Sequence, residues 1–181
     1  MLIRFDDISV NTDEAGAHEL TSYLQSLGHS IMWCISPLVH DCSHEGGEHT
    51  QRVYPRILNA HSDHRLGYQS AFCGVPHAPS GVTVASHGLW HIDHRLLPKP
   101  AQEASILTSC ALTNSKTFVP PFNKWNRDTE AICSEWRVEL VKFESGWKSM
   151  EHEPWDKAHG RWYLHPRFWT VDKMAEYMAV A

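Results

Sequence analysis

Two histidines spaced four residues apart, His87 and His91, are the first residues of this chain that suggest chemistry. They follow the β-branched segment 81–86, which predicts a strand. In a helical turn, positions i and i+4 share one face, so both imidazoles could bind one metal ion. His94 is an alternative ligand on that face, and Asp93 could accept a hydrogen bond from a ligand imidazole. Because the chain contains 14 histidines, a polar turn with chance histidines is the competing explanation.

A second candidate is the pair of adjacent carboxylates, Asp6 and Asp7, at the end of the apolar segment 2–8. Side chains alternate along an extended chain, so the two carboxylates point in different directions and cannot do the same job. One can bind a cation while its neighbour accepts a proton. A turn or helix-cap role is the simpler explanation of an isolated Asp-Asp pair.

Apolar periodicity predicts alternating strands and helices around these residues. We expect helices at 14–27, 101–112, 129–136 and 171–178, and strands at 2–8, 30–35, 81–86, 117–119, 138–143 and 162–164. The polar segment of about 37–81 predicts an irregular insertion within a single domain spanning 1–181. The alternation favours an α/β fold with a mostly parallel sheet or barrel, in which ligands bind at the carboxyl ends of the strands.

Composition limits the partners of the chain. A net charge of −5 without any run of Lys or Arg argues against nucleic acid. No apolar run approaches the roughly 20 residues of a membrane span, and no apolar signal core follows Met1. We therefore expect a cytoplasmic protein, with release by another route as the alternative, and nothing indicates its oligomeric state. The five cysteines are odd in number and form no C-x-x-C pair, which favours reduced thiols.

Four separated motifs occur in a recognisable order, namely Phe5-Asp6-Asp7, His87-x-x-x-His91, Phe118-Val-Pro-Pro-Phe-Asn and Tyr163-Leu-His165-Pro. Together they resemble those of the NodB-like polysaccharide deacetylases (carbohydrate esterase family 4), of which this chain would be a short, divergent member. The resemblance implies that Asp6 is the general base and His165 the general acid. It also implies that Asp7, His87 and His91 hold a divalent metal, with zinc as the first candidate.

The same resemblance implies a substrate groove. Its third motif lines one wall and its last motif lines the acetate pocket. We add two tryptophans that lie beside the motifs and could stack on sugar rings, although tryptophans are more often core residues. The expected substrate-binding residues are Pro120, Pro121, Phe122, Trp125, Leu164 and Trp90.

The chain departs from the family pattern at two motifs. The third motif normally carries an Arg before its prolines that orients the catalytic Asp, whereas this chain has Val119 there. Arg127 and Arg167 are candidate replacements. The fourth motif, an Asp-Trp element, has no match, because Trp155-Asp156 has the reversed order.

The resemblance implies a distorted, reduced (β/α) barrel with seven or fewer strands. It also implies a hydrolase that removes N-acetyl or O-acetyl groups from an amino sugar or polysaccharide. The same metal site could cleave another amide or an ester. A catalytically weak or inactive carbohydrate-binding protein on the same fold is the alternative function, favoured by the missing Arg and disfavoured by the retained base and acid.

Overall fold

The computed structural model describes residues 1–9, 12–37, 75–89, 91–143 and 146–179 of the chain. Most of the predicted insertion, together with Trp90, Cys42 and Cys73, lies outside the described residues. The other three cysteines, Cys34, Cys110 and Cys133, are buried free thiols.

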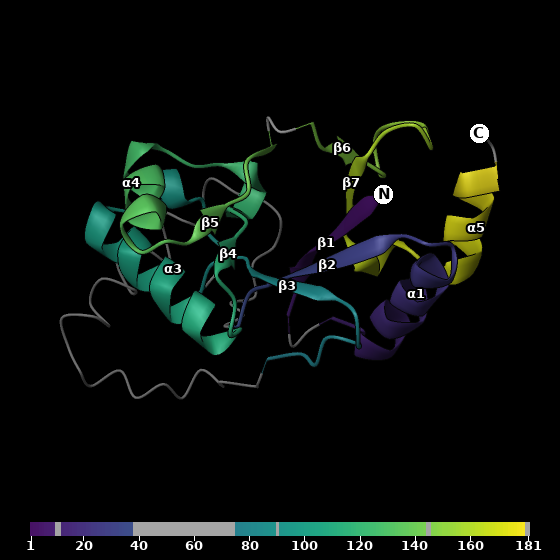
Figure 1. Cartoon of the computed structure of the whole chain (residues 1–181), viewed down its shortest axis with the longest axis horizontal. Coiled ribbons are helices and arrows are strands. Elements are labelled where there is room, and N and C mark those ends of the chain that lie inside the picture. Colours follow the sequence, from purple (N-terminus) through teal and green to yellow (C-terminus); the bar gives the residue numbers. More distant parts are fainter. Residues whose placement is uncertain (10–11, 38–74, 90, 144–145, 180–181) are drawn as a thin grey trace.

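In the described part of the chain, seven strands form one sheet in which every pair is parallel. Their order is β5-β4-β3-β2-β1-β7-β6, so the first and last strands of the chain lie near each other. The strands are β1 (Leu2–Ile8), β2 (Ser30–Ile35), β3 (Thr83–Ser86), β4 (Thr117–Phe118), β5 (Glu139–Leu140), β6 (Lys148–Ser149) and β7 (Arg161–Leu164). The sheet curls into a half-barrel with helices outside it (Figure 1), so the predicted fold class is confirmed.

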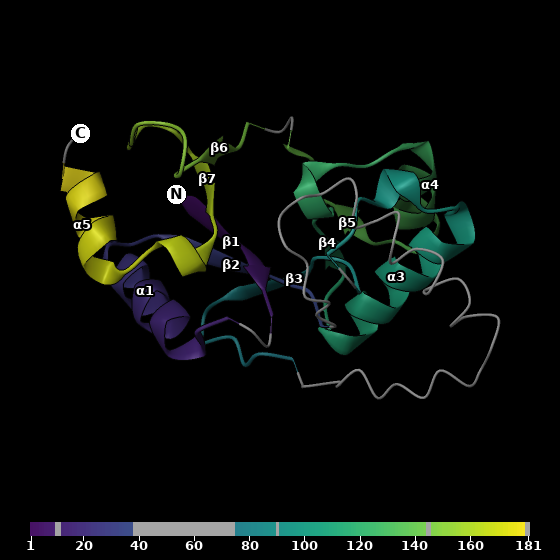
Figure 2. The same ribbon diagram turned by 180° about the vertical axis from the view of Figure 1, so that it is seen from behind.

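Helices cover the half-barrel in two pairs (Figures 1 and 2). One pair lies beside β1 and β2, and the other lies beside β3, β4 and β5. The first pair is α1 (Glu14–Ser26) and α5 (Val171–Ala179), and the second is α3 (Lys99–Leu112) and α4 (Arg127–Glu135). Among the described residues, the short 3-10 helices η1 (His94–Leu96), η2 (Pro121–Asn123) and η4 (Pro166–Phe168) connect these elements.

The two faces of β1 have different surroundings. Ile3 and Phe5 are fully buried against α1, where they join a core cluster with Leu20 and Leu24. The alternate residues, including Arg4, face the concave side of the sheet. Burial of the apolar face fixes the register of β1, because a slip of one residue would exchange the two faces. The polar residues of β1 are therefore held inside the half-barrel.

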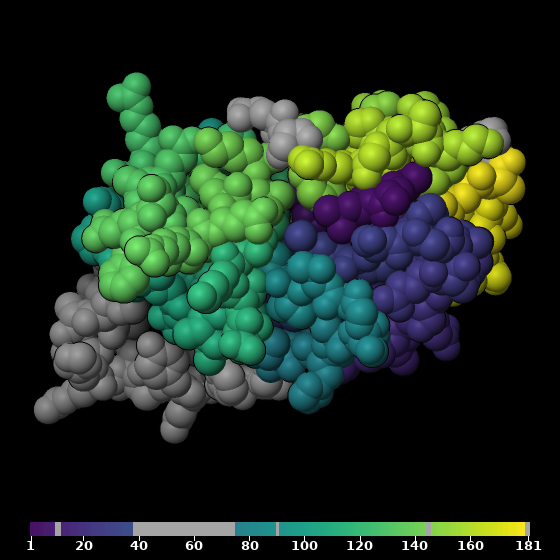
Figure 3. All heavy atoms as spheres, viewed as in Figure 1, coloured from purple at the N-terminus to yellow at the C-terminus, as the bar shows by residue number. Residues whose placement is uncertain are grey.

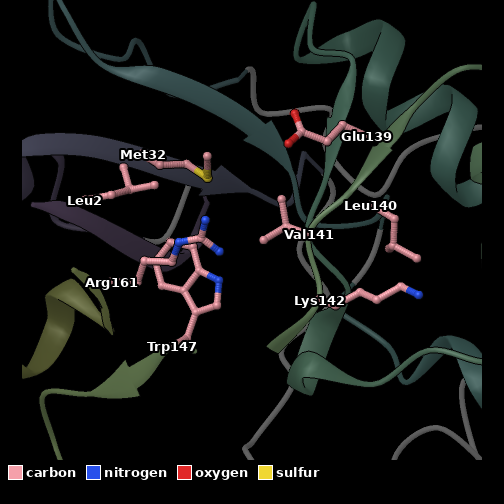
Figure 4. Close-up of a pocket in the computed structure, with 8 residues that line it drawn as sticks. All are labelled: Leu2, Met32, Glu139, Leu140, Val141, Lys142, Trp147 and Arg161. Carbon is pink, nitrogen blue, oxygen red and sulfur yellow. The ribbon is translucent and has the colours of Figure 1, made fainter. Parts of the chain in front are cut away.

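The half-barrel is open between its edge strands β5 and β6. A cavity of about 500 Å³ lies inside the curl, between residues of β1 and β2 on one side and the chain around β5 on the other (Figure 4). Its lining includes Leu2, Met32, Val141, Trp147 and Arg161. On the surface, the purple amino terminus lies between the blue segment that contains β2 and the yellow-green segment near β7 (Figure 3).

Most predicted elements match the structure to within two residues. The strand expected at 138–143 is only two residues long, as β5, because Val141 and Lys142 leave the sheet after one backbone bond from Val141 to Phe118. Strand β6 was not predicted, since two residues are too few for a period to show. None of the helices in the described part of the chain combines the length and apolarity that a bilayer crossing requires.

Candidate metal centre

The carboxyl end of β1 turns its two aspartates toward different partners. Asp6 continues the alternation of the strand and faces the interior, where its Oδ2 accepts a hydrogen bond from Arg4 Nη2 at 2.7 Å. Asp7 has a left-handed φ of 59°, and the pairing of β1 with β2 is irregular between Phe5 and Ile8. A bulge of this kind re-aims a side chain. Asp7 thereby faces His87, His91 and His165. The two carboxylates point in different directions, as the sequence predicts for adjacent residues with different roles.

The two histidines of the second motif come together without a helix. Residues 87–89 and 91–93 belong to no helix or strand, and Gly88 has a φ of 82° that helical residues do not adopt. The predicted helical turn is therefore wrong. His87 is held by its backbone, because its N–H donates to Ile35 O at 2.8 Å and its carbonyl accepts from Ser36. The rings of His87 and His91 still lie 5.2 Å apart.

Three ligand-type atoms converge at this loop. Nε2 of His87 lies 3.3 Å from Asp7 Oδ1, and Nε2 of His91 lies 2.8 Å from the same oxygen. Nδ1 of His87 lies 2.8 Å from the Val119 carbonyl oxygen, which can only accept a hydrogen bond. Nδ1 therefore carries a proton, and Nε2 is the nitrogen that faces the carboxylate oxygen and could serve as a ligand atom.

This convergence fits a cation. Asp7 Oδ1 is buried and has no hydrogen bond of acceptable geometry, although two imidazole nitrogens lie beside it. Ligand atoms on a tetrahedral zinc ion with bonds of about 2.1 Å lie about 3.4 Å apart. The distance from His87 Nε2 to Asp7 Oδ1 is close to this value, at 3.3 Å, and that from His91 Nε2 is shorter, at 2.8 Å. Among the described residues, Asp7, His87 and His91 form the group of His, Cys and acidic side chains that could hold a metal ion.

The ionisation of Asp7 also suits a ligand. Burial by itself would raise the pKa of Asp7, but the facing imidazoles of His87 and His91 hold it well below its ordinary value. The carboxylate is therefore charged across the neutral pH range. The nearby thiol of Cys34 is different, because burial and the neighbouring Asp6 carboxylate raise its pKa well above the ordinary value. Cys34 stays protonated and does not compete as a ligand.

Two sequence-based alternatives at this loop are not supported. His94 is fully buried, and its ring nitrogens lie 3.0 Å from Ile92 O and 3.1 Å from Ser105 Oγ, away from Asp7. Burial lowers its pKa to about 4, so it is a neutral structural residue. Asp93 does not accept from a ligand imidazole either. Its carboxylate pairs with Arg95 at 2.8 Å, and the Val119 carbonyl takes the expected place beside His87.

The far end of the chain brings His165 to the same place. β7 pairs with β1 so that Leu164 lies opposite Phe5, and His165 follows directly. Its Nε2 lies 3.6 Å from Asp7 Oδ2, and its Nδ1 lies 3.4 Å from Glu151 Oε1. Burial alone would lower the pKa of His165, but the carboxylates of Glu151, Asp7 and Asp6 raise it.

Glu151 is a site residue that the sequence analysis missed. Its Oε1 also accepts the backbone N–H of His165 at 2.7 Å and Trp169 Nε1 at 3.2 Å. Burial alone would raise the pKa of Glu151, yet His165 and Ser149 lower it to about 2. No sequence signal distinguishes Glu151 from the exposed Glu153 in the same turn.

Arg4 is the second missed residue. Arg127 and Arg167 were candidate replacements for the missing Arg beside Asp6, but the guanidinium that contacts Asp6 belongs to Arg4, two residues earlier on the same strand. Arg167 instead lies 3.7 Å from Asp7, and Arg127 is exposed at the start of α4. The sequence did contain one indication of this role, namely an Arg inside an apolar strand. Such an Arg is rarely buried unless it is paired with an acidic group.

Comparison with known proteins identifies the fold. No protein-family model matches the chain, and no curated protein matches its sequence. Among solved structures, a family 4 carbohydrate esterase from Streptomyces lividans in complex with acetate is 15% identical, with a TM-score of 0.54 over 98% of this chain and 83% of that one. A peptidoglycan deacetylase from Bacillus subtilis is 13% identical, with a TM-score of 0.54 over 99% and 82%.

A third similar structure is a family 4 pseudoenzyme from Bacillus anthracis, which is 12% identical, with a TM-score of 0.57 over 99% of this chain. This chain has the fold of the family 4 carbohydrate esterases. The resemblance inferred from four motifs is thus confirmed at the level of the fold. The chain spans 59% of the length of the pseudoenzyme and 83% of the length of the Streptomyces lividans esterase.

Among the residues expected to line a substrate groove, some lie beside a ligand histidine candidate or a cavity, and others are buried. Phe122 has a left-handed φ of 57°, and its ring lies 4.3 Å from that of His91. Pro121 precedes Phe122 in η2 and is buried. Trp125 lines a cavity of about 300 Å³ with Arg95, Asn123, Lys124 and Phe143.

Two other residues expected to bind substrate, Leu164 and Pro120, are buried. Leu164 is fully buried in the core cluster with Ile3 and Phe5, so it packs against the same face of the sheet as they do. Pro120 precedes η2 as its cap and is buried next to Val119. Trp90 lies outside the described residues.

Proposed function

We propose that this chain is a metal-dependent hydrolase that removes acetyl groups from an amino sugar within a carbohydrate. The observation that carries the proposal is the convergence of Asp7, His87 and His91, with Asp6 and His165 beside them, on a family 4 carbohydrate esterase fold. The similar structures include a carbohydrate esterase and a peptidoglycan deacetylase, which supports a carbohydrate substrate.

Asp7, His87 and His91 would hold the metal, with zinc as the first candidate. A divalent cation bound there supplies Lewis-acid polarisation of a carbonyl group and lowers the pKa of a coordinated water molecule. Val119 fixes the tautomer of His87 through its carbonyl, so that Nε2 stays available as a ligand atom. Phe122 packs on His91 and shields that ring from solvent.

Asp6 would act as the general base. Arg4 occupies its Oδ2, and its Oδ1 is buried without a hydrogen-bond partner among the described side chains. Oδ1 is therefore the atom that accepts the proton of an attacking water molecule. Asp6 and Asp7 are adjacent, so base and ligand serve the same centre from one strand end.

His165 would act as the general acid. The carboxylates of Glu151, Asp7 and Asp6 raise the pKa of His165, which favours the imidazolium form that can protonate a leaving amine. Glu151 contacts Nδ1 and leaves Nε2 directed toward Asp7 and the reaction centre. Asp6 and His165 thereby flank the ligand group from the neighbouring strands β1 and β7.

Acetate release tests the proposal. Purified protein loaded with zinc is incubated with N-acetylated oligosaccharides, with O-acetylated glycans in a parallel arm, and free acetate is measured. We expect acetate that disappears after metal removal by a chelator and returns when zinc is added. Absence of acetate from every glycan would contradict the hydrolase assignment.

A carbohydrate-binding protein without turnover is the second candidate. The specific observation in its favour is the similarity to a family 4 pseudoenzyme, a mutant of which has restored enzymatic activity. Binding of N-acetylated oligosaccharides, measured by calorimetry, together with no acetate release from zinc-loaded protein would support this candidate over the hydrolase.

A further inference from the structure

We propose that Arg4 is the positioning residue of the reaction, because it holds the Asp6 carboxylate in the orientation that a general base requires. This inference rests on the proposed function. Nη2 of Arg4 donates to Asp6 Oδ2 at 2.7 Å, and both side chains are almost completely buried. Arg4 and Asp6 lie two residues apart on β1, so the alternation of the strand places them on one face.

Arg4 is itself fixed from several directions. Nη2 also donates to Asn123 Oδ1 at 2.7 Å. The guanidinium lies 4.7 Å from the ring centroid of Trp147 and 5.2 Å from that of Tyr163, which are favourable cation–π distances. A planar guanidinium held between aromatic rings and two acceptors has little freedom to rotate. The Asp6 carboxylate, which accepts a hydrogen bond from this guanidinium, is therefore held in one orientation as well.

The contact divides the two oxygens of Asp6 between different tasks. Arg4 binds Oδ2, whereas Oδ1 is buried and accepts no hydrogen bond among the described residues. If the carboxylate rotated about its χ2 angle, the free oxygen would leave its present direction. Arg4 therefore acts through Asp6 and does not need to touch the substrate.

Asn123 connects this pair to the opposite wall of the site. It belongs to η2, in which the neighbouring Phe122 packs on His91. Phe122 and Asn123 both have left-handed φ angles, 57° and 55°, which non-glycine residues rarely adopt. The hydrogen bond from Arg4 to Asn123 thus ties the base on β1 to the loop that contacts a ligand histidine.

A purely structural ion pair is the competing explanation, and it makes different predictions. A buried charge pair can often be removed as a whole with little harm, whereas removal of one partner destabilises the protein. A structural role would lower the yield of folded protein and leave turnover per folded molecule unchanged. A positioning role lowers the turnover of molecules that are folded and loaded with zinc.

The central experiment compares Arg4→Met and Arg4→Lys with the wild type. For Arg4→Met we expect kcat to fall on the order of 10²-fold, because a small misplacement of a catalytic group has an effect of that size. KM and the zinc affinity measured by calorimetry should each stay within about twofold, since neither substrate nor metal ligands are changed. Arg4→Lys should restore part of kcat, because an ammonium group replaces the charge without the planar fork.

Two controls separate positioning from loss of stability. Ile106→Ala opens a buried site in the cluster formed by α3, α4 and β4, away from Asp6, and should keep kcat per folded molecule. In an Asp6→Asn background, Arg4→Met should reduce the residual kcat by less than about twofold, because the partner it orients is already lost. An equal loss in both backgrounds would overturn the proposal.

The behaviour of the Arg4 variants also tests the positioning role directly. A folded Arg4→Met protein with wild-type kcat overturns the proposal. If Arg4→Met does not fold, Arg4→Lys and Asn123→Ala replace it, and wild-type kcat in both overturns the proposal. If the wild type releases no acetate, the proposed function fails, and a crystal structure of Arg4→Lys decides the inference. A reoriented Asp6 carboxylate supports it, and an unmoved carboxylate overturns it.

Discussion

Replacement of Glu151 by Gln tests the acid side of the site. Gln is nearly isosteric with Glu and keeps an oxygen that can accept the N–H groups of His165 and Trp169. The substitution therefore removes the negative charge beside His165 Nδ1, at 3.4 Å, more than it changes the packing. We expect a loss of stability that depends on pH and a shift of the activity profile.

The stability effect follows from the pKa of Glu151. Its fall from the ordinary value of 4.5 to about 2 corresponds to roughly 3 kcal/mol of folding free energy, at about 1.4 kcal/mol per factor of ten in proton affinity. Because the folded pKa is depressed, this contribution is present above pH 4.5 and is lost as the pH falls through about 2. The pKa of His165 is raised, so its contribution is full below 6.5 and is lost as the pH rises through the folded value.

Urea unfolding of metal-free protein measures the difference between wild type and Glu151→Gln. Near pH 6, where both partners are charged, we expect roughly 3 kcal/mol, and near pH 3 about 1 kcal/mol. The basic limb of the acetate-release profile should move to lower pH, because His165 loses its proton earlier without the carboxylate. Glu153→Gln, an exposed control in the same turn, should change neither quantity. Equal free-energy differences at the two pH values, or an unmoved basic limb, would refute the reasoning.

Other substitutions test the remaining roles. His91→Ala should lose bound zinc in elemental analysis, whereas His94→Ala should keep zinc and lower the melting temperature, because His94 is a buried structural residue; zinc loss in His94→Ala alone would reverse the ligand assignment. Val119→Arg should lower the melting temperature without raising turnover, since it buries a second guanidinium in a fully buried apolar position, and a large gain in turnover at an unchanged melting temperature would contradict this. Asp6→Asn and His165→Ala should each retain zinc and lose turnover by on the order of 10²-fold or more, and wild-type turnover in either variant would remove that residue from the scheme.

The fold was predictable because apolar residues recur at regular spacing in its longer strands and helices. The apolar strand β1 and the helix α1 bury one face each, and burial leaves a regular spacing in the sequence. The two-residue strands β5 and β6 have no such spacing, and their places depend on pairing with distant strands. Sequence periodicity therefore predicts the centre of the sheet better than its edges.

The candidate site was predictable as far as its residues lie next to strand ends. Asp7, His87 and His165 do so, and the structure brings them together. The local geometry was not predictable, because a bulge with a left-handed Asp7 and the left-handed Gly88 replaces the regular strand and helix that the spacing suggested. Regular periods contain no information about such irregular backbone.

The two residues that support the site were missed for a related reason. Arg4 contacts Asp6 because the alternation of β1 places both side chains on one face of the strand. The sequence alone does not indicate which acidic residue pairs with an isolated Arg in a strand. Glu151 reaches His165 only through the fold, since 14 residues separate them. Sequence motifs identify groups that could react, whereas the groups that orient them depend on tertiary contacts.

The charges of these two supports bear on the choice between an enzyme and a binding protein. Arg4 places a cation against the Asp6 carboxylate, and Glu151 places an anion against His165. These contacts favour the ionised form of the proposed base and the protonated form of the proposed acid, which are the forms required before reaction. A protein that only binds a neutral sugar gains nothing from two opposed, oriented ionic pairs, and burial of Arg4 is costly. Similar structures include active enzymes and a pseudoenzyme on one fold, so the fold does not separate the alternatives. The paired supports favour hydrolysis, because they stabilise the proposed base and the proposed acid beside one candidate metal centre.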